Sequence, residues 1–387
     1  MTSVRSRGRW IGVLTAVAVA VVPALLSDAT GQAKTDPEPE HPQIVGAQVG
    51  GSSLTPQQLA GQRIIYSYTG LTPPTSLIQR IKAGEAAGVI FFGDNISSEP
   101  QIASVVSQLR KASAQSPVTS PLLLMTDQEG GEVRRLPGAP AMSEKQIGEA
   151  ADPVTAAGQA GTGAGQNLAG VGMNVNLAPV LDVFRTPGDF DDQFQRSYSS
   201  DPAAVSRLGT AFVTAQQAVG PAATVKHFPG LGAATASQNT DETPVTLNVS
   251  LSDLRSIDEA PYPAAIAAGV KLVMVSWATY PSLDANHPAG LSSAVVQGEL
   301  RDRLGFHGVT ITDALEAGSL QAFGTDKQRA VAAAAAGMDL ILCSDGSVTQ
   351  GNDVDAGLVA ALQSGALSQS TFDAAVNRVT ALRGGLH

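Results

Sequence analysis

Cysteine, histidine and aromatic residues are all rare in the sequence. Their scarcity argues against disulfide bonds, against a metal site and against an aromatic core. The single cysteine, Cys343, leaves no partner for an intrachain disulfide. The five histidines lie far apart and form no cluster with metal-ligand spacing, so we expect no metal and no other cofactor. Aromatic residues make up only 4% of the chain, which predicts a core that is mostly aliphatic and rich in alanine.

Positive charge is also scarce. The chain carries 24 Lys and Arg against 34 Asp and Glu, a formal net charge of −10 at pH 7. Phosphate backbones are bound through basic surfaces, so this balance argues against a nucleic-acid partner. Hydrophobic residues still make up 43% of the chain, which is enough for a large core.

The first residues have the pattern of an export leader. Three arginines, Arg5, Arg7 and Arg9, precede an apolar run from Trp10 to Leu26. We expect residues 1–33 to be a signal peptide or an N-terminal anchor, residues 34–52 a linker, and residues 53–387 one domain. Export through this leader predicts a secreted or cell-envelope protein, which touches a membrane only if the leader is not cleaved.

Short apolar runs alternate with amphipathic segments over the rest of the chain. The runs predict eight buried parallel strands, at 63–66, 88–92, 121–125, 172–177, 223–225, 271–275, 309–311 and 340–342. Helices are predicted at 100–114, 202–218, 327–337, 358–365 and 370–382. This alternation favours an α/β fold built as a single (β/α)8 TIM-type barrel, in which chemistry occurs at the carboxyl ends of the strands.

Polar residues follow several of these strands. Asp127 and Glu129 come after the third, Arg196 lies in the next loop, Lys226 and His227 end the fifth, and Asp313 ends the seventh. Each has a structural reading as well, since a carboxylate can cap a helix and an arginine can form a surface ion pair. Side-chain alternation would point Lys226 and His227 to different sides of their strand.

Four segments in order make the pattern specific: DQEGGEVRRL, LAPVLDV, KHFPGLG and ITDALEAG. They resemble the signature segments of the glycoside hydrolase family 3 N-terminal domain, over about Leu54 to Leu382. The lack of a second domain-sized block points to the single-domain bacterial β-N-acetylhexosaminidase branch. The resemblance implies a retaining glycosidase, usually monomeric, that removes terminal N-acetylglucosamine from glycans such as those of peptidoglycan.

The resemblance also implies roles for single residues. Asp313 matches the catalytic nucleophile of the family. The residues that match its sugar-hydroxyl contacts are Asp127, Arg196, Lys226 and His227.

One part of the family pattern is missing. The loop after KHFPG usually carries Asp-Ser-His, whose histidine is the general acid/base, and this triplet falls here on Ser237-Gln238-Asn239. Leu231 and Trp277 also replace family histidines. An amide cannot exchange a proton near neutral pH, and general acid/base assistance is commonly worth about 10²–10⁴ in rate.

Three readings of this departure remain open. A relocated acid could serve, with Asp241 and Glu242 on the same loop, expected to be mobile, and His287 as a weaker candidate. An external anion such as phosphate, or a group of the substrate, could replace the acid. Alternatively, the protein is a sugar-binding pseudoenzyme. An aldolase or a metal-dependent barrel enzyme is disfavoured, because no Schiff-base lysine or ligand cluster is evident.

Overall fold

The computed structural model describes residues 54–386. The expected leader and linker lie outside these residues. Eight parallel strands form one sheet in the order β11-β8-β7-β6-β3-β2-β1-β12. Their bounds are β1 Ile64–Tyr66, β2 Gly88–Ile90, β3 Leu123–Thr126, β6 Val175–Asn176, β7 Ala222–Phe228, β8 Leu272–Val275, β11 Val309–Thr312 and β12 Ile341–Leu342.

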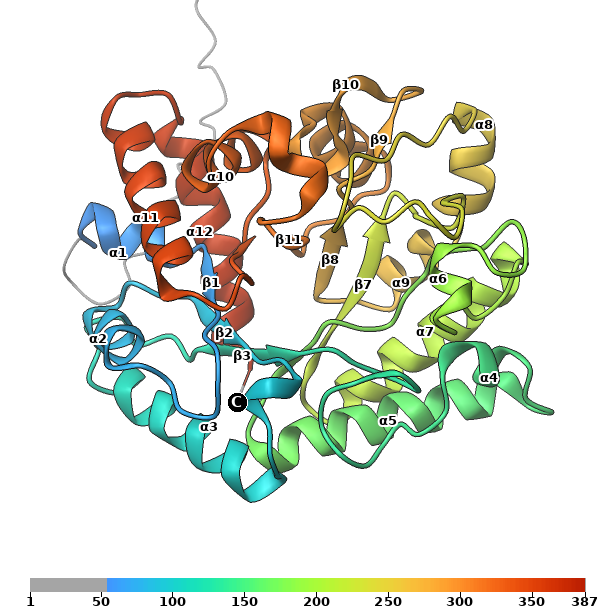
Figure 1. Cartoon of the computed structure of the whole chain (residues 1–387), viewed down its shortest axis with the longest axis horizontal. Coiled ribbons are helices and arrows are strands. Elements are labelled where there is room, and N and C mark those ends of the chain that lie inside the picture. Colours follow the sequence, from blue (N-terminus) through green and yellow to red (C-terminus); the bar gives the residue numbers. More distant parts are fainter. Residues whose placement is uncertain (1–53, 387) are drawn as a thin grey trace, which may run out of the picture. The chain divides into compact units, whose positions relative to one another are not determined.

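The two ends of this sheet meet, so the strands form a nearly closed ring (Figure 1). A single bridge joins Ile311 to Leu340 across the gap. Two backbone hydrogen bonds support it, from Thr312 N to the Leu340 carbonyl at 3.0 Å and from Leu340 N to the Thr310 carbonyl at 2.9 Å. The structure therefore confirms the expected TIM-type barrel.

Helices cover the outside of the ring. The longer ones are α2 Thr75–Ala83, α3 Glu99–Ser113, α5 Pro153–Val171, α7 Pro202–Ala218, α10 Asp326–Ala336, α11 Val348–Gln363 and α12 Gln369–Gly384. Shorter helices are α1 Pro56–Gly61, α4 Glu144–Gly148, α6 Phe190–Gln193, α8 Leu251–Asp253 and α9 Tyr262–Ala267, with a π-helical segment at Ala294–Arg303. Two small hairpins project from the strand ends: β4 Gln128–Gly130 with β5 Val133–Arg134, and β9 Thr279–Tyr280 with β10 Asp284–Pro288.

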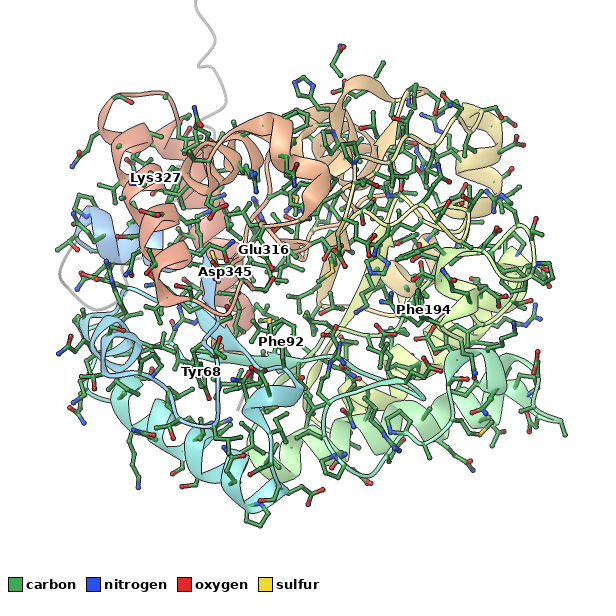
Figure 2. All side chains as sticks on the ribbon, viewed as in Figure 1. Tyr68, Phe92, Phe194, Glu316, Lys327 and Asp345 are labelled. Atoms are coloured by element: carbon green, nitrogen blue, oxygen red, sulfur yellow. The ribbon has the colours of Figure 1, made fainter. Side chains whose placement is uncertain are left out.

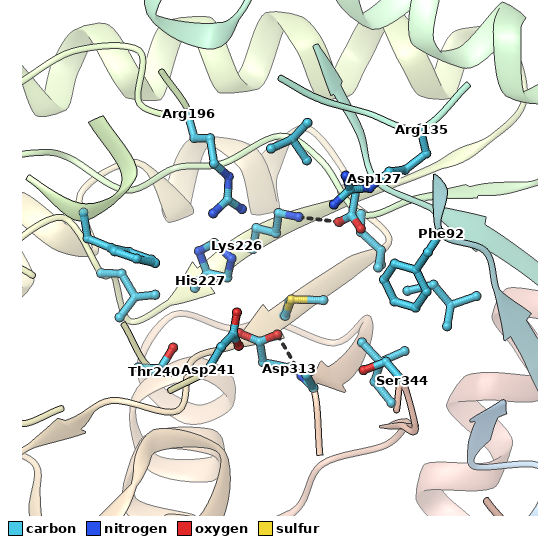
Figure 3. Close-up of a pocket in the computed structure, with 18 residues that line it drawn as sticks. Phe92, Asp127, Arg135, Arg196, Lys226, His227, Thr240, Asp241, Asp313 and Ser344 are labelled. Carbon is cyan, nitrogen blue, oxygen red and sulfur yellow. Dashed lines mark hydrogen bonds and ion pairs between the residues drawn. The ribbon is translucent and has the colours of Figure 1, made fainter. Parts of the chain in front are cut away.

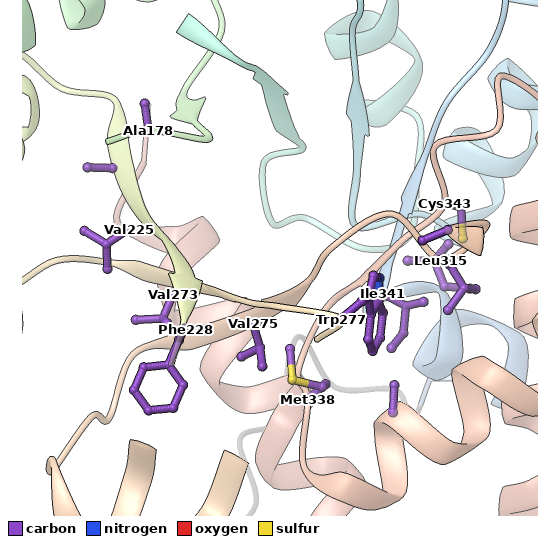
Figure 4. Packing of buried hydrophobic residues seen from close by; sticks show 14 of the residues in the cluster. Ala178, Val225, Phe228, Val273, Val275, Trp277, Leu315, Met338, Ile341 and Cys343 are labelled. Carbon is purple, nitrogen blue, oxygen red and sulfur yellow. The ribbon is translucent and has the colours of Figure 1, made fainter. Parts of the chain in front are cut away.

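Alternation along the strands divides the core into two layers. In β1, Ile65 belongs to a cluster inside the ring, together with Met125 and Ile311. Its neighbours Ile64 and Tyr66 belong to the larger cluster between strands and helices. Figure 4 shows part of this outer layer, in which Phe228, Trp277 and other buried side chains pack behind the strands. Both faces of β1 are therefore apolar, which is why this strand reads as a continuous hydrophobic run.

Candidate active site

A pocket lies where the strands end. Its volume is about 230 Å³, and its floor is the top of the inner core layer, with Ile90, Leu177, Met274 and Leu342. Phe92, near the middle of the view in Figure 2, forms part of the wall. The other wall residues are mostly polar or charged: Asp127, Arg135, Arg196, Lys226, His227, Thr240, Asp241, Asp313 and Ser344. All five residues matched to the nucleophile and the sugar contacts are thus brought together (Figure 3).

Ion pairs link one side of the pocket into a continuous network. The Lys226 Nζ lies 2.8 Å from an oxygen of Asp127 and 2.8 Å from one of Glu129. The Arg196 guanidinium holds both oxygens of Glu129, each at 2.9 Å, and also an oxygen of Asp191 at 2.8 Å. Paired, hydrogen-bonded charges of this kind fix the direction of every side chain in the network.

The network stays charged although it is buried. Burial disfavours the ionised form of Glu129, but Arg196 and Lys226 outweigh it and lower the pKa of Glu129 to about 2. Burial likewise opposes the charge of Lys226, yet Asp127 and Glu129 raise the pKa of Lys226 above its usual value. A ligand in the pocket therefore meets a preorganised set of charged donors and acceptors.

His227 is held by a buried carboxylate. Its Nδ1 lies 2.7 Å from Asp182, which also accepts the backbone N–H of Leu231 at 2.6 Å. Burial lowers the pKa of His227 to about 4, so the ring is neutral at neutral pH.

Lys226 and His227 both line the pocket, contrary to the expectation that they point to different sides. The pairing of β7 with β8 shifts register between Val225 and Phe228. The regular alternation of side chains does not hold across this irregular stretch.

Asp313 follows β11 directly, on the opposite side of the pocket from the ion network. One of its oxygens accepts the N–H of Ala314 at 2.8 Å. Trp277, which stands where a family histidine was expected, donates its indole N–H to the Ala314 carbonyl at 2.8 Å and so supports the same turn. Burial, with Asp241 as the next cause, raises the pKa of Asp313 to about 6.

The loop after β7 brings one of the three acid candidates into the pocket. Ser237, Gln238 and Asn239 are not among the pocket-lining residues, whereas Asp241 is one of them. Although Asp241 is exposed as a whole residue, its side chain lies beside Asp313 in the cavity (Figure 3). Burial of the carboxyl group raises the pKa of Asp241, a shift that Arg196 opposes and Glu316 reinforces.

The other two acid candidates lie elsewhere. Glu242 is exposed and does not line the pocket. His287 is on the exposed part of β10, where its Nδ1 lies 3.0 Å from Asp284.

Sequence reasoning noted Glu129 after the third strand without giving it a specific role, and it missed several other residues of the site. Arg135 and Ser344 line the pocket, while Glu129, Asp182 and Asp191 hold the residues that do. A signal existed for three of them, because Glu129 and Arg135 belong to the DQEGGEVRRL segment and Asp182 to LAPVLDV. Asp191 lies in an acidic stretch that reads equally well as solvated surface.

Among residues 54–386, Asp182, Asp191 and His227 form a group whose possible ligand atoms lie within 4.8 Å of one another. The Nδ1 of His227 lies 2.7 Å from Asp182, and the Arg196 guanidinium lies 2.8 Å from Asp191, so both carboxyl groups already have partners that a cation would have to displace.

No helix among the described residues is long and apolar enough to span a bilayer.

The site combines two kinds of chemistry. One wall offers fixed donors and acceptors suited to hydroxyl groups, and the other offers two neighbouring carboxyl groups with raised pKa values. Two carboxyl groups are what a glycosidase needs for nucleophilic attack and for proton transfer.

Comparisons with known proteins agree with this chemistry. The chain is 48% identical to an uncharacterized secreted glycosyl hydrolase of Arthroderma benhamiae, over 84% of this chain and 92% of that one. It is 33% identical to a beta-hexosaminidase of Stenotrophomonas maltophilia strain R551-3, over 66% of this chain and 75% of that one.

Solved structures show the same fold. A β-N-acetylhexosaminidase from Beutenbergia cavernae superposes with a TM-score of 0.78 at 33% identity, covering 86% of this chain and all of that one. A glycoside hydrolase family 3 β-N-acetylglucosaminidase from a Paenibacillus species gives a TM-score of 0.81 at 34% identity, covering 86% of this chain but 63% of that one. The pattern of the glycosyl hydrolase family 3 N-terminal domain matches residues 66–382, and the chain therefore belongs to glycoside hydrolase family 3.

Proposed function

We propose that this protein is a retaining β-N-acetylhexosaminidase that removes terminal β-linked N-acetylglucosamine from cell-wall-type glycans. The observation that carries the proposal is the pairing of Asp313 with Asp241 in a pocket whose other wall is a fixed ion network. Relatives named as hexosaminidases support the substrate class. The relative named as secreted, together with the basic and apolar N-terminus, supports export.

Asp313 is suited to be the nucleophile. Its carboxylate attacks the anomeric carbon as the bond to the leaving oxygen breaks, which gives a covalent glycosyl-enzyme that water then hydrolyses. The Ala314 N–H donates to the carboxylate, and Trp277 supports the turn at Ala314. Together these two contacts fix the direction of the carboxylate. Burial keeps it poorly solvated, so less water must be removed before attack.

Asp127, Arg196, Lys226 and His227 are suited to hold the terminal sugar. Sugar hydroxyls both donate and accept hydrogen bonds, and this wall offers carboxylate acceptors beside ammonium and guanidinium donors. Arg135, at the same wall, adds a further guanidinium.

Asp241 is proposed as the general acid/base in place of the missing histidine. A carboxyl group with a raised pKa can protonate the leaving oxygen and later take a proton from the attacking water. Glu242 lacks access to the pocket, and His287 lies on β10 outside its lining, so the structure favours Asp241 among the candidates.

A second candidate function is sugar binding without turnover. It is favoured by Asn239, because the position of the family acid/base carries a group that cannot transfer a proton.

Leaving-group dependence tests these proposals. We would measure kcat/KM on dinitrophenyl and methylumbelliferyl β-N-acetylglucosaminides, since the first leaving group needs no proton and the second benefits from one. Asp313→Asn should abolish both rates. Asp241→Asn should lower only the methylumbelliferyl rate, by about 10²–10⁴, and Glu242→Gln is the matched control.

Each alternative has its own outcome. A wild-type protein that binds N-acetylglucosamine and cleaves neither substrate would establish the pseudoenzyme reading. A sugar phosphate among the products when phosphate is added would show that an external anion serves as acceptor. Equal loss of both rates in Asp241→Asn would contradict the role of Asp241 as the acid.

A further inference from the structure

Asn239 occupies the position of the family acid/base, yet its side chain is engaged in a turn. Its Oδ1 accepts the backbone N–H of Asp241 at 2.9 Å. Its carbonyl oxygen accepts the N–H groups of Glu242, at 3.2 Å, and Thr243, at 3.0 Å. An asparagine that accepts from the backbone two residues on is a common way to build a tight turn. The residue that replaced the histidine thus shapes the segment that carries Asp241.

This turn is docked on the segment that follows the nucleophile. The Gly318 N–H donates to the carbonyl of Asp241 at 2.7 Å, and the Ser319 N–H donates to the carbonyl of Thr240 at 3.1 Å. Gly318 lies only a few residues beyond Asp313. Two neighbouring backbone hydrogen bonds therefore join the segment that carries Asp241 to the segment that carries Asp313. These hydrogen bonds attach the loop after β7 to the segment that follows Asp313.

Only a glycine fits at the junction. A Cβ atom on Gly318 would lie 2.1 Å from the carbonyl oxygen of Glu242 and 3.0 Å from that of Asp241. Both contacts are with backbone, which cannot rotate away as a side chain can. Any larger residue at 318 must therefore push the Asp241 turn off the segment that follows Asp313.

The nucleophile side of the junction is itself fixed. The Ala314 carbonyl accepts both the Trp277 indole N–H, at 2.8 Å, and the Ala317 N–H, at 3.1 Å. The Leu315 N–H donates to the carbonyl of Leu342 in β12, at 3.0 Å. The chain from Asp313 to Gly318 is thus held in place by hydrogen bonds to its surroundings. The Asp241 turn, which is bonded to this chain, is held in place with it.

We propose that Asn239 and Gly318 are positioning residues, which together hold the Asp241 carboxyl group at a fixed place relative to the Asp313 carboxyl group. Asn239 sets the shape of the turn, and Gly318 sets where the turn lies. This inference rests on the proposed function, because it assumes that Asp241 transfers the proton. Geometry within a fraction of an ångström decides how well such a proton transfer works.

The test separates proton transfer from folding by comparing the two leaving groups. Asn239→Ala removes the Oδ1 acceptor and should lower kcat/KM on the methylumbelliferyl substrate by about 10- to 100-fold, within the range that acid catalysis is worth. The rate on the dinitrophenyl substrate should stay near that of the wild type, since its departure needs no proton. Gly318→Ala should show the same selective loss.

Conservative replacement supplies a second readout. Asn239→Asp keeps an oxygen acceptor for the Asp241 N–H, so activity on the methylumbelliferyl substrate should be restored. The added negative charge should also raise the pKa of Asp241, which moves the alkaline limb of the pH profile to higher pH. A merely structural role for Asn239 would leave the ratio of the two rates unchanged in Asn239→Ala.

Matched controls exist in the chain. Asn248 is exposed further along the same segment, and Asn248→Ala should change neither rate. Gly158 lies on α5 with nothing within 4 Å of its Cβ position, so Gly158→Ala controls for the added methyl group.

The outcomes distinguish this inference from the proposed function. If Asp241→Asn changes the ratio of the two rates but Asn239→Ala and Gly318→Ala do not, the positioning role is wrong and the acid assignment stands. If both substrates lose the same fraction of their rate in the two positioning variants, the positioning role is also wrong. If Asp241→Asn itself leaves the ratio unchanged, the acid assignment has failed.

Discussion

To act as the proposed nucleophile, Asp313 must be ionised, and its surroundings oppose that ionisation. Burial and the neighbouring Asp241 raise its pKa to about 6. Below the pKa of the unfolded chain the group is neutral in both states and costs nothing. As the pH rises from about 4 to about 6, the unfolded chain ionises while the folded state still holds its proton, so stability falls and then levels off above 6.

The first prediction follows from the direction of this pH dependence of stability. Asp313→Asn removes the charge, so it should stabilise the protein by about 3 kcal/mol at pH 7.5 and have little effect below pH 4. Urea unfolding of both proteins at a series of pH values measures the difference. Asp302→Asn, at an exposed position, provides the control. A difference between the Asp313 variant and the wild type that does not change with pH would contradict the prediction.

The sequence predicted the site residues that follow a strand. It did not predict the residues that position them through hydrogen bonds and ion pairs. Lys226, His227 and Asp313 each follow a buried apolar run, so the barrel rule alone places them at one rim. Asp191 lies in the short helix α6 and Asn239 in an irregular loop, and their roles depend on which backbone group or arginine the fold brings near. No periodic pattern in the sequence indicates which residues will form these contacts.

Among the elements, all eight strands lie where the sequence predicts them, whereas α2 and α5 were not predicted and α11 begins at Val348, ahead of the expected 358. The sequence of α5 contains glycines at 158, 161, 163, 165 and 170, which are poor helix formers. Tertiary packing outweighs that propensity. A Cβ at Gly161 would lie 2.3 Å from the carbonyl oxygen of Phe212 in α7, so the glycines let the two helices pack closely.

The second prediction compares two glycines of α5. Gly161→Ala should destabilise the protein by about 1–3 kcal/mol, because the methyl group forces the two helices apart. Gly158→Ala has open space at the same position and should stabilise by about 0.5–1 kcal/mol through helix propensity. Thermal or urea unfolding of the pair measures both. Equal shifts in the two variants would mean that close helix packing does not explain the glycines.

At the scale of the whole molecule, buried arginines link the first strands of the barrel to its last strand and helix. Arg383 in α12 donates to the carbonyls of Ser120 and Pro121, at 2.8 and 2.6 Å, and to the side chain of Gln62 before β1. Arg63 donates to the carbonyls of Met338 and Asp339, just before β12. These contacts lie around the strands that close the ring.

The third prediction concerns this closure. Arg383→Ala leaves buried carbonyl groups without donors and a cavity beside them, so it should cost about 3 kcal/mol of unfolding free energy. Lys82→Ala, at an exposed position of α2, should change stability by less than about 0.5 kcal/mol. Urea unfolding provides the measurement. A small effect of Arg383→Ala would show that the barrel closes without this residue.

The charges that surround the pocket have a consequence for the medium in which the protein works. Two cations, Arg196 and Lys226, are paired there with the carboxyl groups of Asp127, Glu129 and Asp191. A neutral sugar that enters the pocket displaces water but leaves these ion pairs in place and releases no counterions. Its affinity should therefore be nearly independent of ionic strength, even though the protein as a whole carries a net charge of −10. Such a site can recognise the same sugar in fresh water and in brine.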